Sequence, residues 1–456
     1  MRDASAGGIW AIACASVRGF LTKVKPRGSL WHNHDFLNFW AAHTVSQFGS
    51  QITGLALPLV AILALEASAF QVATLGVVEF LPWVLLSLPA GVWVDRLPRR
   101  PILIAADWGR AAVLGSIPVT YFLDVLTLGQ LYVVGFVAGT LTVFFDVSYQ
   151  SYLPSLVERE ELPEGNSKLE VSRSAAQVGG PGLAGVLVSA LAAPYAILAD
   201  AASFVASALF LLRVRRREAA PASPAMERPS MRAEIAQGLR FVIRHPLLRP
   251  YMLFVATGNF FMTLLSSIFL VFAVRELDLT PGTIGLILSL GNIGSLIGAL
   301  SATRVARKLG IGTALIGVAA AGHFSLILIP LASGGTVIPF LVISHVLLGF
   351  YILNWYVTAI SLIQAITPEH LLGRTNASRR FVVWSVIPFG GLAGGALASA
   401  VGLREAIWVG AIGASAAVVW LVFSPVRSIR TIEDAEEMVR GINDEFALAG
   451  GGTSTT

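Results

Sequence analysis

Long apolar segments recur along the whole chain, and they constrain its fold more than any other feature. About twenty apolar residues are enough for a helix to cross the hydrocarbon core of a bilayer. Twelve such segments are separated by charged residues or by Gly and Pro: 36–63, 71–94, 101–123, 128–150, 168–190, 193–213, 250–273, 282–303, 311–331, 337–362, 380–400 and 405–424. Because they are continuously apolar and do not alternate, a membrane β-barrel is excluded. The sequence predicts an all-α multi-pass membrane protein with twelve transmembrane helices.

The composition excludes several other classes of protein. Of the 456 residues, 55% are hydrophobic and 13% are charged, against about 25% charged in a soluble domain. The formal net charge of +5 reflects basic residues in the connections, where they act as topology signals, so no nucleic-acid partner is expected. A single cysteine, Cys14, excludes an internal disulfide and a cysteine-based metal cluster. The chain has no nucleotide-binding loop and no hydrolase motif. We therefore expect no cofactor, no metal and no enzymatic activity, and an ion gradient as the energy source.

Basic residues are sorted between the two sides of the predicted membrane. One set of connections carries most of them: Arg96, Arg99 and Arg100; Arg159 and Lys168; those between 213 and 249; Arg304, Arg307 and Lys308; Arg374, Arg379 and Arg380. The other set carries only Arg275 and Arg404. Cytoplasmic loops carry the excess of Lys and Arg. The sequence therefore predicts a cell-membrane protein with both termini and the long central connection in the cytoplasm.

One long hydrophilic segment, 214–249, divides the chain into a helical bundle over 34–213 and another over 250–425. Part of this linker has the pattern of a short amphipathic helix lying on the inner leaflet, with apolar Phe241 and Val242 among charged residues. Residues 426–456 form a cytoplasmic tail, and 431–447 have helical apolar spacing. Both segments are expected to steady the connection between the halves in a monomer. Residues 1–33 are interpreted as a cytoplasmic extension or an over-long start, with an uncleaved signal as the alternative.

The two halves repeat one another. Gly135-Phe136 matches Gly349-Phe350 at an offset of 214, and 182–185 matches 391–394 at an offset of 209. The basic residues after the second span match those of 304–308 at an offset of 208. Six spans repeated in parallel predict two pseudo-symmetric six-helix bundles, with a substrate site between them near the midplane. The alternative is that glycine-rich membrane helices resemble one another by composition.

The connection between the second and third spans, Gly91-Val-Trp-Val-Asp95-Arg96-Leu-Pro-Arg99-Arg100, resembles the signature loop of the major facilitator superfamily. A degenerate copy, 298–308, lies where that superfamily has its second copy, and the resemblance covers about 34–425. The run 151–157 followed by Asn166 is similar to the bacterial exporter branch that includes enterobactin and macrolide efflux proteins. The resemblance implies a transporter and leaves the substrate open.

The signature loop is expected to act as a gate. Asp95 ends a span, where the helix dipole disfavours an anion, so it needs partners. Candidates are the arginines of its own loop and Arg379 and Arg380 at the start of the eleventh span. We expect Asp95 to tether the halves when the site faces outward; the alternative is a solvated loop charge. The second copy has Thr303 in place of the acid, so only one half has such a latch.

Charged side chains within the spans are costly, and away from the span ends they all lie in the first half. Asp107 with Arg110 and Glu170 with Arg173 are three residues apart, so each pair can neutralise itself. Asp146 lies about one turn from the inner end of its span. These five residues are expected to be structural or to belong to the cytoplasmic gate. In the second half, His323 and His345 are the only titratable residues of comparable depth.

Glu79 differs from the other acids because it lies near the midplane with no basic residue three or four positions away. A lone carboxylate there favours its neutral form and can bind or release a proton as the cavity opens and closes. Glu79 is our leading proton carrier and Asp200 the second. The alternative is a neutral buried acid bonded to a neighbouring hydroxyl.

Substrate contacts are expected from polar and aromatic residues at mid-depth: Gln47, Gln51, Trp83, Asn259, Asn292, Asn354, Trp355 and Tyr356. For each of them, helix packing is an equal alternative. An apolar cavity with a few polar groups suits a bulky amphiphile. The sequence favours a proton-coupled exporter of drug-like or macrolide-like small molecules. The alternatives are a dedicated siderophore or metabolite exporter and, from another class, a non-transporting sensor or scaffold.

Overall fold

The computed structural model describes residues 30–216, 218 and 240–450, apart from some side chains, among them those of Asp95, Arg374 and 442–450. Over these residues every regular element is helical. Twelve spans in the described part of the chain are long and apolar enough to cross a membrane, which confirms the predicted number.

The first six spans are single helices: α2 (His34–Leu63), α3 (Ala69–Arg96), α4 (Arg99–Phe122), α5 (Leu128–Leu156), α6 (Leu162–Leu191) and α7 (Ala193–Arg213). The second six are α9 (Leu248–Arg275), α10 (Pro281–Leu309), α11 with α12 (Ile311–Ser325, Leu328–Leu331), α13 (Val337–Ile366), α14 (Glu369–Val401) and α15 with α16 (Leu403–Ala417, Val419–Val422). A tail helix, α17 (Ile432–Gly450), follows.

Several helices are longer than the apolar segments that predicted them. α5 continues to Leu156, α6 begins at Leu162 and α14 begins at Glu369. Hydropathy marks only the part of a helix inside the bilayer, whereas backbone hydrogen bonding continues into the polar region. The ninth and twelfth spans are each interrupted near their ends, between α11 and α12 and between α15 and α16.

Polar caps explain where several helices begin. The Asn33 side chain accepts hydrogen bonds from the backbone N–H groups of Asp35 and Phe36, both at 3.1 Å, and so begins α2. Ser68 and Gln71 form a reciprocal capping box at α3. Thr280, followed by Pro281, starts α10. Each such cap stabilises its helix by about 1 kcal/mol.

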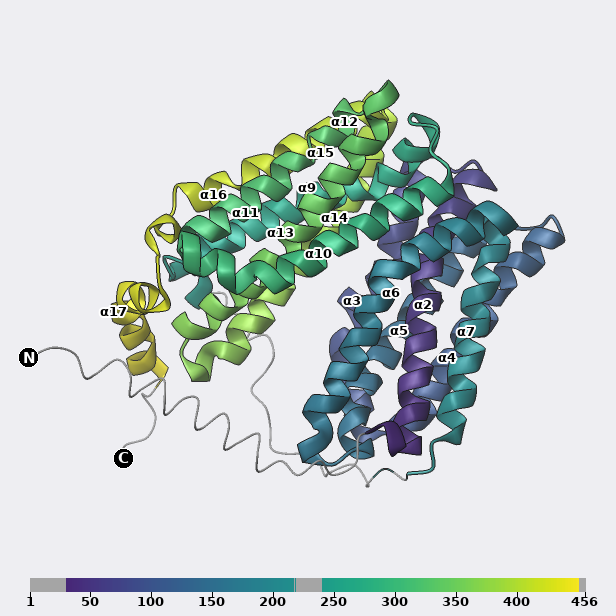
Figure 1. Ribbon diagram of the computed structural model, residues 1–456, viewed down its shortest axis with the longest axis horizontal. Coiled ribbons are helices and arrows are strands. Elements are labelled where there is room, and N and C mark those ends of the chain that lie inside the picture. The colour runs from purple at the N-terminus through teal and green to yellow at the C-terminus, as the bar shows by residue number, and fades with distance from the viewer. Residues whose placement is uncertain (1–29, 217, 219–239, 451–456) are drawn as a thin grey trace, which may run out of the picture.

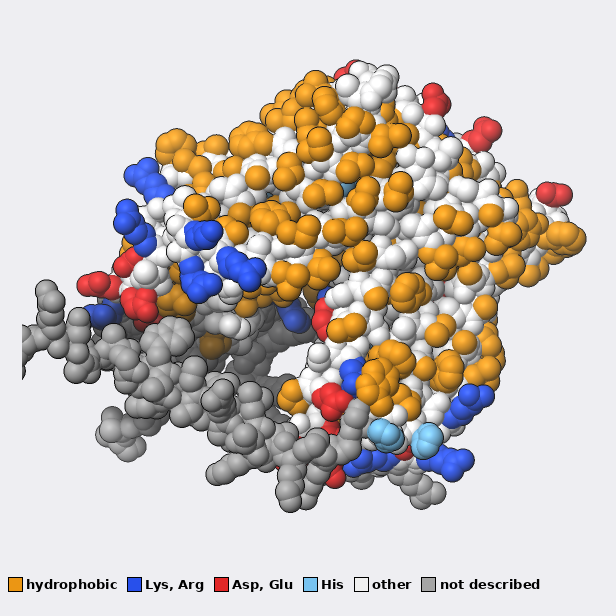
Figure 2. All heavy atoms as spheres, viewed as in Figure 1, with side chains coloured by type: hydrophobic (Ala, Val, Ile, Leu, Met, Phe, Trp, Pro, Cys, Tyr) orange, Lys and Arg blue, Asp and Glu red, His pale blue; other side chains and the backbone are white. Residues whose placement is uncertain are grey.

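The helices form two bundles, α2–α7 and α9–α16, which lie side by side in Figure 1. The beginning of α2, the end of α7, the beginning of α9 and the tail helix α17 lie at the same end of the molecule, here called the linker side; the opposite end is the far side. The bundles meet toward the far side and diverge toward the linker side. Figure 2 shows the hollow between them there, and Lys and Arg side chains gathered at the linker-side ends.

Glycines let the bundles approach closely on the far side. A Cβ on Gly185 of α6 would lie 3.0 Å from the Cα of Gly282 on α10, and one on Gly285 would lie 3.0 Å from the Cα of Gly185. Across the same interface, Gly182 N–H donates to Ser289 Oγ at 2.8 Å. Small residues at such a crossing allow backbones to pack without a side chain between them.

The second contact between the bundles joins α3 to α14. Gly395 of α14 packs against Phe70 and Ala73 of α3. Nearby, Arg275 Nη2 donates to the carbonyl oxygen of Ala67 at 2.8 Å. The bundles are therefore closed against each other at the far side by two helix pairs, α6 with α10 and α3 with α14.

The described end of the linker packs against the second bundle. Residues 240–244 are helical, and Phe241 and Val242 are buried among residues of that bundle. These two side chains therefore cover the bundle, which corrects the expectation that they face the inner leaflet. The predicted linker residues 219–239 lie outside the described residues. In the tail, Ala435 and Val439 of α17 are buried in the same cluster.

His245 caps the beginning of α9 in its neutral form. Its Nδ1 accepts hydrogen bonds from the backbone N–H groups of Leu247 and Leu248, both at 3.2 Å. The ring is fully buried, and burial lowers the pKa of His245 to about 4.

This capping histidine predicts acid sensitivity. Below about pH 6.5 this histidine is protonated in the unfolded chain but stays neutral in the folded chain. The free energy of unfolding therefore falls by about 1.4 kcal/mol per pH unit as the pH drops, and it levels off below about pH 4, where the folded chain also binds the proton. Between pH 7 and pH 5 we expect a loss of about 2 kcal/mol. Thermal unfolding of the purified protein across this range measures it. His245→Asn, which can still accept the two N–H bonds, should show a shallower pH dependence; an unchanged slope would contradict the assignment.

Candidate functional site

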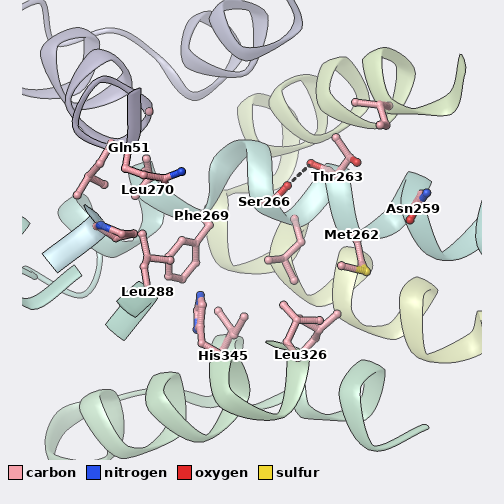
Figure 3. A pocket seen from close by; sticks show the side chains of 17 residues that line it. Gln51, Asn259, Met262, Thr263, Ser266, Phe269, Leu270, Leu288, Leu326 and His345 are labelled. Carbon is pink, nitrogen blue, oxygen red and sulfur yellow. Dashed lines mark hydrogen bonds between the residues drawn. The ribbon is translucent and has the colours of Figure 1, made fainter. Parts of the chain in front are cut away.

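A cavity of about 510 Å³ lies between the two bundles. It is lined by Gln51, Gly54 and Leu55 of α2, Pro181 of α6, Asn259, Met262, Thr263, Leu265, Ser266, Phe269 and Leu270 of α9, Leu288 of α10, Leu326 directly after α11, Ile329 of α12, His345 and Leu348 of α13, and Ile387 of α14. Ten of these side chains are labelled in Figure 3. Among the described residues the wall is neutral and largely apolar, and it belongs mainly to the second bundle.

α9 provides the polar stripe of this wall. Asn259, Thr263 and Ser266 follow one another at intervals of four and three residues, so they share one face of the helix. Phe269 continues the same face toward the far side. Sequence reasoning selected only Asn259 from this stripe. The helical spacing of the polar residues is the signal that could have found the other two.

Only some of the residues predicted to contact substrate line the cavity. Gln51 and Asn259 line the cavity. Trp83 contacts the Trp384 ring across the bundle interface at 6.1 Å between centroids. Asn292 Nδ2 donates to the carbonyl oxygen of Gln177 at 2.6 Å, again across the bundles. Gln47 is half-buried on α2 and is not among the cavity-lining residues.

The three consecutive candidates of α13 lie outside the cavity wall. Asn354 is buried and donates to the carbonyl oxygen of Gly298 at 3.2 Å. Trp355 is stacked on Tyr251 inside the second bundle. Tyr356 is half exposed on the surface. The structure therefore gives Asn354 and Trp355 packing roles, the alternative that their residue types left open.

A charged cluster lies inside the first bundle. The Arg110 guanidinium donates to Asp107 on the same helix, as the spacing predicts, and both side chains are almost fully buried. The other oxygen of Asp107 accepts a hydrogen bond from Ser207 of α7 at 2.6 Å. Arg110 lies between the rings of Phe145 and Phe204, at 4.2 and 4.0 Å. Desolvated cation–π contacts of this kind stabilise a buried guanidinium.

The other acids predicted within the spans of this bundle, apart from Glu79, have neighbours that can bind them. Asp200 is buried and accepts a hydrogen bond from Ser203 at 3.0 Å. Asp146 has Arg110 and Arg173 as charged neighbours. The second predicted pair, Glu170 with Arg173, is present at 3.7 Å and is exposed.

Glu79 is the exception. It lies on the face of α3 that packs against α5, where its Cγ fills the space left by Gly135. Two neighbouring positions, Phe80 and Trp83, reach Trp384 of the other bundle, so Glu79 lies beside the bundle interface. Its side chain is half-buried and forms no hydrogen bond or ion pair with another described residue.

The signature loop is anchored within the first bundle. The backbone N–H groups of Arg99 and Arg100 donate to the Glu218 carboxylate at 2.7 and 3.1 Å. The Arg100 guanidinium donates to the carbonyl oxygens of Leu211 and Leu212 at the end of α7. Two of the predicted gate residues thus connect α4 to α7 and to the start of the linker.

The remaining residues of the signature loop and their predicted partners lie at the linker-side ends of α3 and α14. Gly91 has open space beside it, and Arg96 is exposed. Arg380 lies 5.9 Å from the Trp384 ring, whereas Arg379 is half-buried. The Asp95 side chain is outside the described residues, so its tether to α14 stays a prediction.

Two six-helix bundles with a cavity between them, which among the described residues pack together at one side and diverge at the other, define a membrane transporter of the major facilitator superfamily, not an enzyme. The profile of the transmembrane secretion effector family matches residues 29–444. The chain belongs to this family.

Its similarity to characterised relatives is distant. The multidrug efflux pump Tap of Mycolicibacterium fortuitum is 27% identical over 374 residues, which cover 78% of this chain and 87% of that protein. Macrolide efflux protein A of Streptococcus pyogenes is 27% identical over 154 residues, 34% of this chain and 38% of that protein. The chain therefore resembles drug efflux pumps.

Solved structures share the fold. A bacterial homologue of the iron transporter ferroportin in its inward-facing state is 20% identical, with a TM-score of 0.69 over 87% of this chain and 99% of that chain. For the ferroportin homologue in its outward-facing state, also 20% identical, the TM-score is 0.54 over 85% of this chain and 98% of that chain. A mutant nucleoside transporter, 12% identical, has a TM-score of 0.70 over 85% and 99%.

Proposed function

We propose that this protein is a proton-coupled exporter that moves amphiphilic small molecules out of the cell by alternating access. The observation that carries the proposal is the cavity of about 510 Å³ between two bundles whose described residues pack closely together at the far side. Its wall is apolar with a few polar groups, as in sites for bulky drug-like ligands. The likeness to multidrug and macrolide efflux proteins supports the direction and the substrate class.

The orientation follows from the charges. Lys and Arg gather at the linker-side ends of the helices (Figure 2), and cytoplasmic segments carry the excess of basic residues. The linker side is then the cytoplasm, and this structure faces inward. The greater likeness to the inward-facing than to the outward-facing ferroportin homologue supports this orientation of the bundles.

Energy comes from a proton that Glu79 binds from outside and releases inside. Among the acids described within the spans, Glu79 combines a position beside the interface with the lack of a described partner, so its protonation can respond to cavity opening. Asp200 is the second candidate. Export of one dedicated siderophore or metabolite is the alternative, and the neutral wall of the cavity favours amphiphiles over it.

Everted membrane vesicles test the proposal. A proton gradient is imposed, and dyes, macrolides and a siderophore are added separately to record which accumulates. Gradient-dependent accumulation of dyes and macrolides is expected. Accumulation of the siderophore alone would favour the dedicated exporter, and no accumulation would favour a sensor or scaffold.

Alternating access requires the far-side contact to open and close. Valine at position 285 would push against the carbonyl oxygen of Pro181 and the backbone of Gly185, so the closed far side becomes strained. In Gly285→Val we expect the outward-facing state to gain population and export to fall.

Labelling from the cell exterior measures this shift. A Ser266→Cys reporter in the cavity, in a Cys14→Ser background, should react several-fold faster with an impermeant maleimide when Gly285→Val is present. Gly317→Val is the matched control, because a Cβ at Gly317 meets no described atom within 4 Å. Equal labelling in both variants would argue against closure by this contact.

A further inference from the structure

His345 presents one fixed hydrogen-bond acceptor to the cavity. It lies on α13, and its ring points into the cavity in Figure 3. Its Nδ1 is 2.9 Å from the carbonyl oxygen of Leu341, one turn earlier. A carbonyl oxygen can only accept, so Nδ1 carries the proton. In the neutral ring, Nε2 is then an acceptor and cannot donate.

The surrounding packing holds this ring in place. The backbone of His345 lies against Gly291 of α10, where a Cβ would come within 3.1 Å of it. The Phe269 ring lies 5.0 Å from the imidazole, between centroids. Nε2 forms no hydrogen bond with a described residue, and part of its surface is accessible. The acceptor is therefore pre-oriented and accessible from the cavity.

The other polar groups of the wall are less selective. The amides of Gln51 and Asn259 and the hydroxyl of Thr263 can each donate or accept. The Ser266 hydroxyl donates to the carbonyl oxygen of Thr263 at 3.3 Å (Figure 3), but a hydroxyl can rotate and donate to a ligand instead. No described residue of the wall carries a formal charge with His345 neutral. Among the described polar groups of the wall, His345 Nε2 is thus the one that cannot become a donor by rotation of its bonds, so it requires a donor on the ligand.

We infer that His345 is a specificity-determining residue that selects amphiphiles bearing an N–H or O–H donor on an otherwise apolar body. This inference rests on the proposed function, since it concerns the ligands of the same cavity. A ligand without a donor displaces water from Nε2 but forms no hydrogen bond with it, so the desolvated nitrogen stays unpaired and binding is weaker. Donor-free analogues of the same shape should therefore bind more weakly or gain nothing from His345.

Two rhodamine dyes with the same ring skeleton test the inference, each compared between the wild type and the variant. Unsubstituted rhodamine methyl ester carries N–H donors, whereas tetramethylrhodamine methyl ester carries none. Their dissociation constants are measured by fluorescence polarisation with the purified full-length protein. In His345→Leu, binding of the first dye should weaken by about tenfold, as expected for one lost hydrogen bond. Binding of the second dye should change by less than about twofold. His345→Gln, which retains an acceptor, should recover part of the loss.

The chain offers a matched control in His323. This histidine lies in the same bundle, is fully buried between Phe254 and Tyr351, and does not line the cavity. His323→Leu should leave both dissociation constants unchanged. The inference is overturned if His345→Leu weakens both dyes equally, if it weakens neither, or if the wild type binds neither. Transport is scored separately in vesicles, so binding with the expected selectivity but without gradient-driven accumulation would count against the proposed function alone.

Discussion

Glu79→Gln is expected to abolish uphill transport while sparing ligand binding. Glutamine has nearly the same shape but cannot carry a proton, so the exchange loses its driving ion. With one proton exchanged per substrate, a gradient of two pH units can sustain a concentration ratio of about a hundredfold, because one pH unit is worth about 1.4 kcal/mol. The wild type should approach that ratio in everted vesicles. The variant should reach a ratio of about one, with its dissociation constant for the dye within about threefold of the wild type.

Two further variants sharpen this test. Glu436→Gln is the control, because Glu436 is an exposed acid of the tail helix α17, outside both bundles and the predicted gate. It should accumulate substrate like the wild type. Asp200→Asn tests the second candidate. Normal accumulation by Glu79→Gln would remove Glu79 from the mechanism, and loss in Asp200→Asn alone would transfer the role to Asp200.

Arg110→Met is expected to destabilise the first bundle by about 3–5 kcal/mol, because it leaves the buried Asp107 carboxylate without its cation. Methionine retains apolar contact with Phe145 and Phe204. The double variant Asp107→Asn, Arg110→Met removes both charges and should recover most of the loss. Unfolding of the purified proteins measures the coupling between the two positions.

The exposed pair provides the comparison. Arg173→Met breaks a contact at 3.7 Å between side chains that are 53% and 61% exposed, and such pairs contribute less than about 1 kcal/mol. If Arg110→Met unfolds like the wild type but no longer transports, the buried pair serves the gate and not the fold. If the double variant is as unstable as Arg110→Met, the unpaired carboxylate is not the cause.

The sequence predicted side-chain roles better in the first half of the protein than in the second. In the first half, charges within spans are rare and costly, so spacing alone predicted the pair Asp107 with Arg110, which the structure shows. In the second half the candidates were neutral. Asn292 and Asn354 are each bonded to a backbone carbonyl of another helix, and residue type alone could not separate that role from ligand binding.

The sequence by itself determined the twelve spans, their division into six and six, and the side on which basic residues gather. In lipid, a backbone must form its hydrogen bonds within a helix and charged side chains must stay near the membrane surface, so few arrangements of the chain are possible. Only the tertiary structure decided which helix faces line the cavity. A membrane helix is apolar both toward lipid and toward its neighbours, so hydrophobic periodicity does not reveal its inner face. The spacing of Asn259, Thr263 and Ser266 can be read from the sequence, but only the packing of α9 and α13 shows that this stripe and the acceptor of His345 face the cavity.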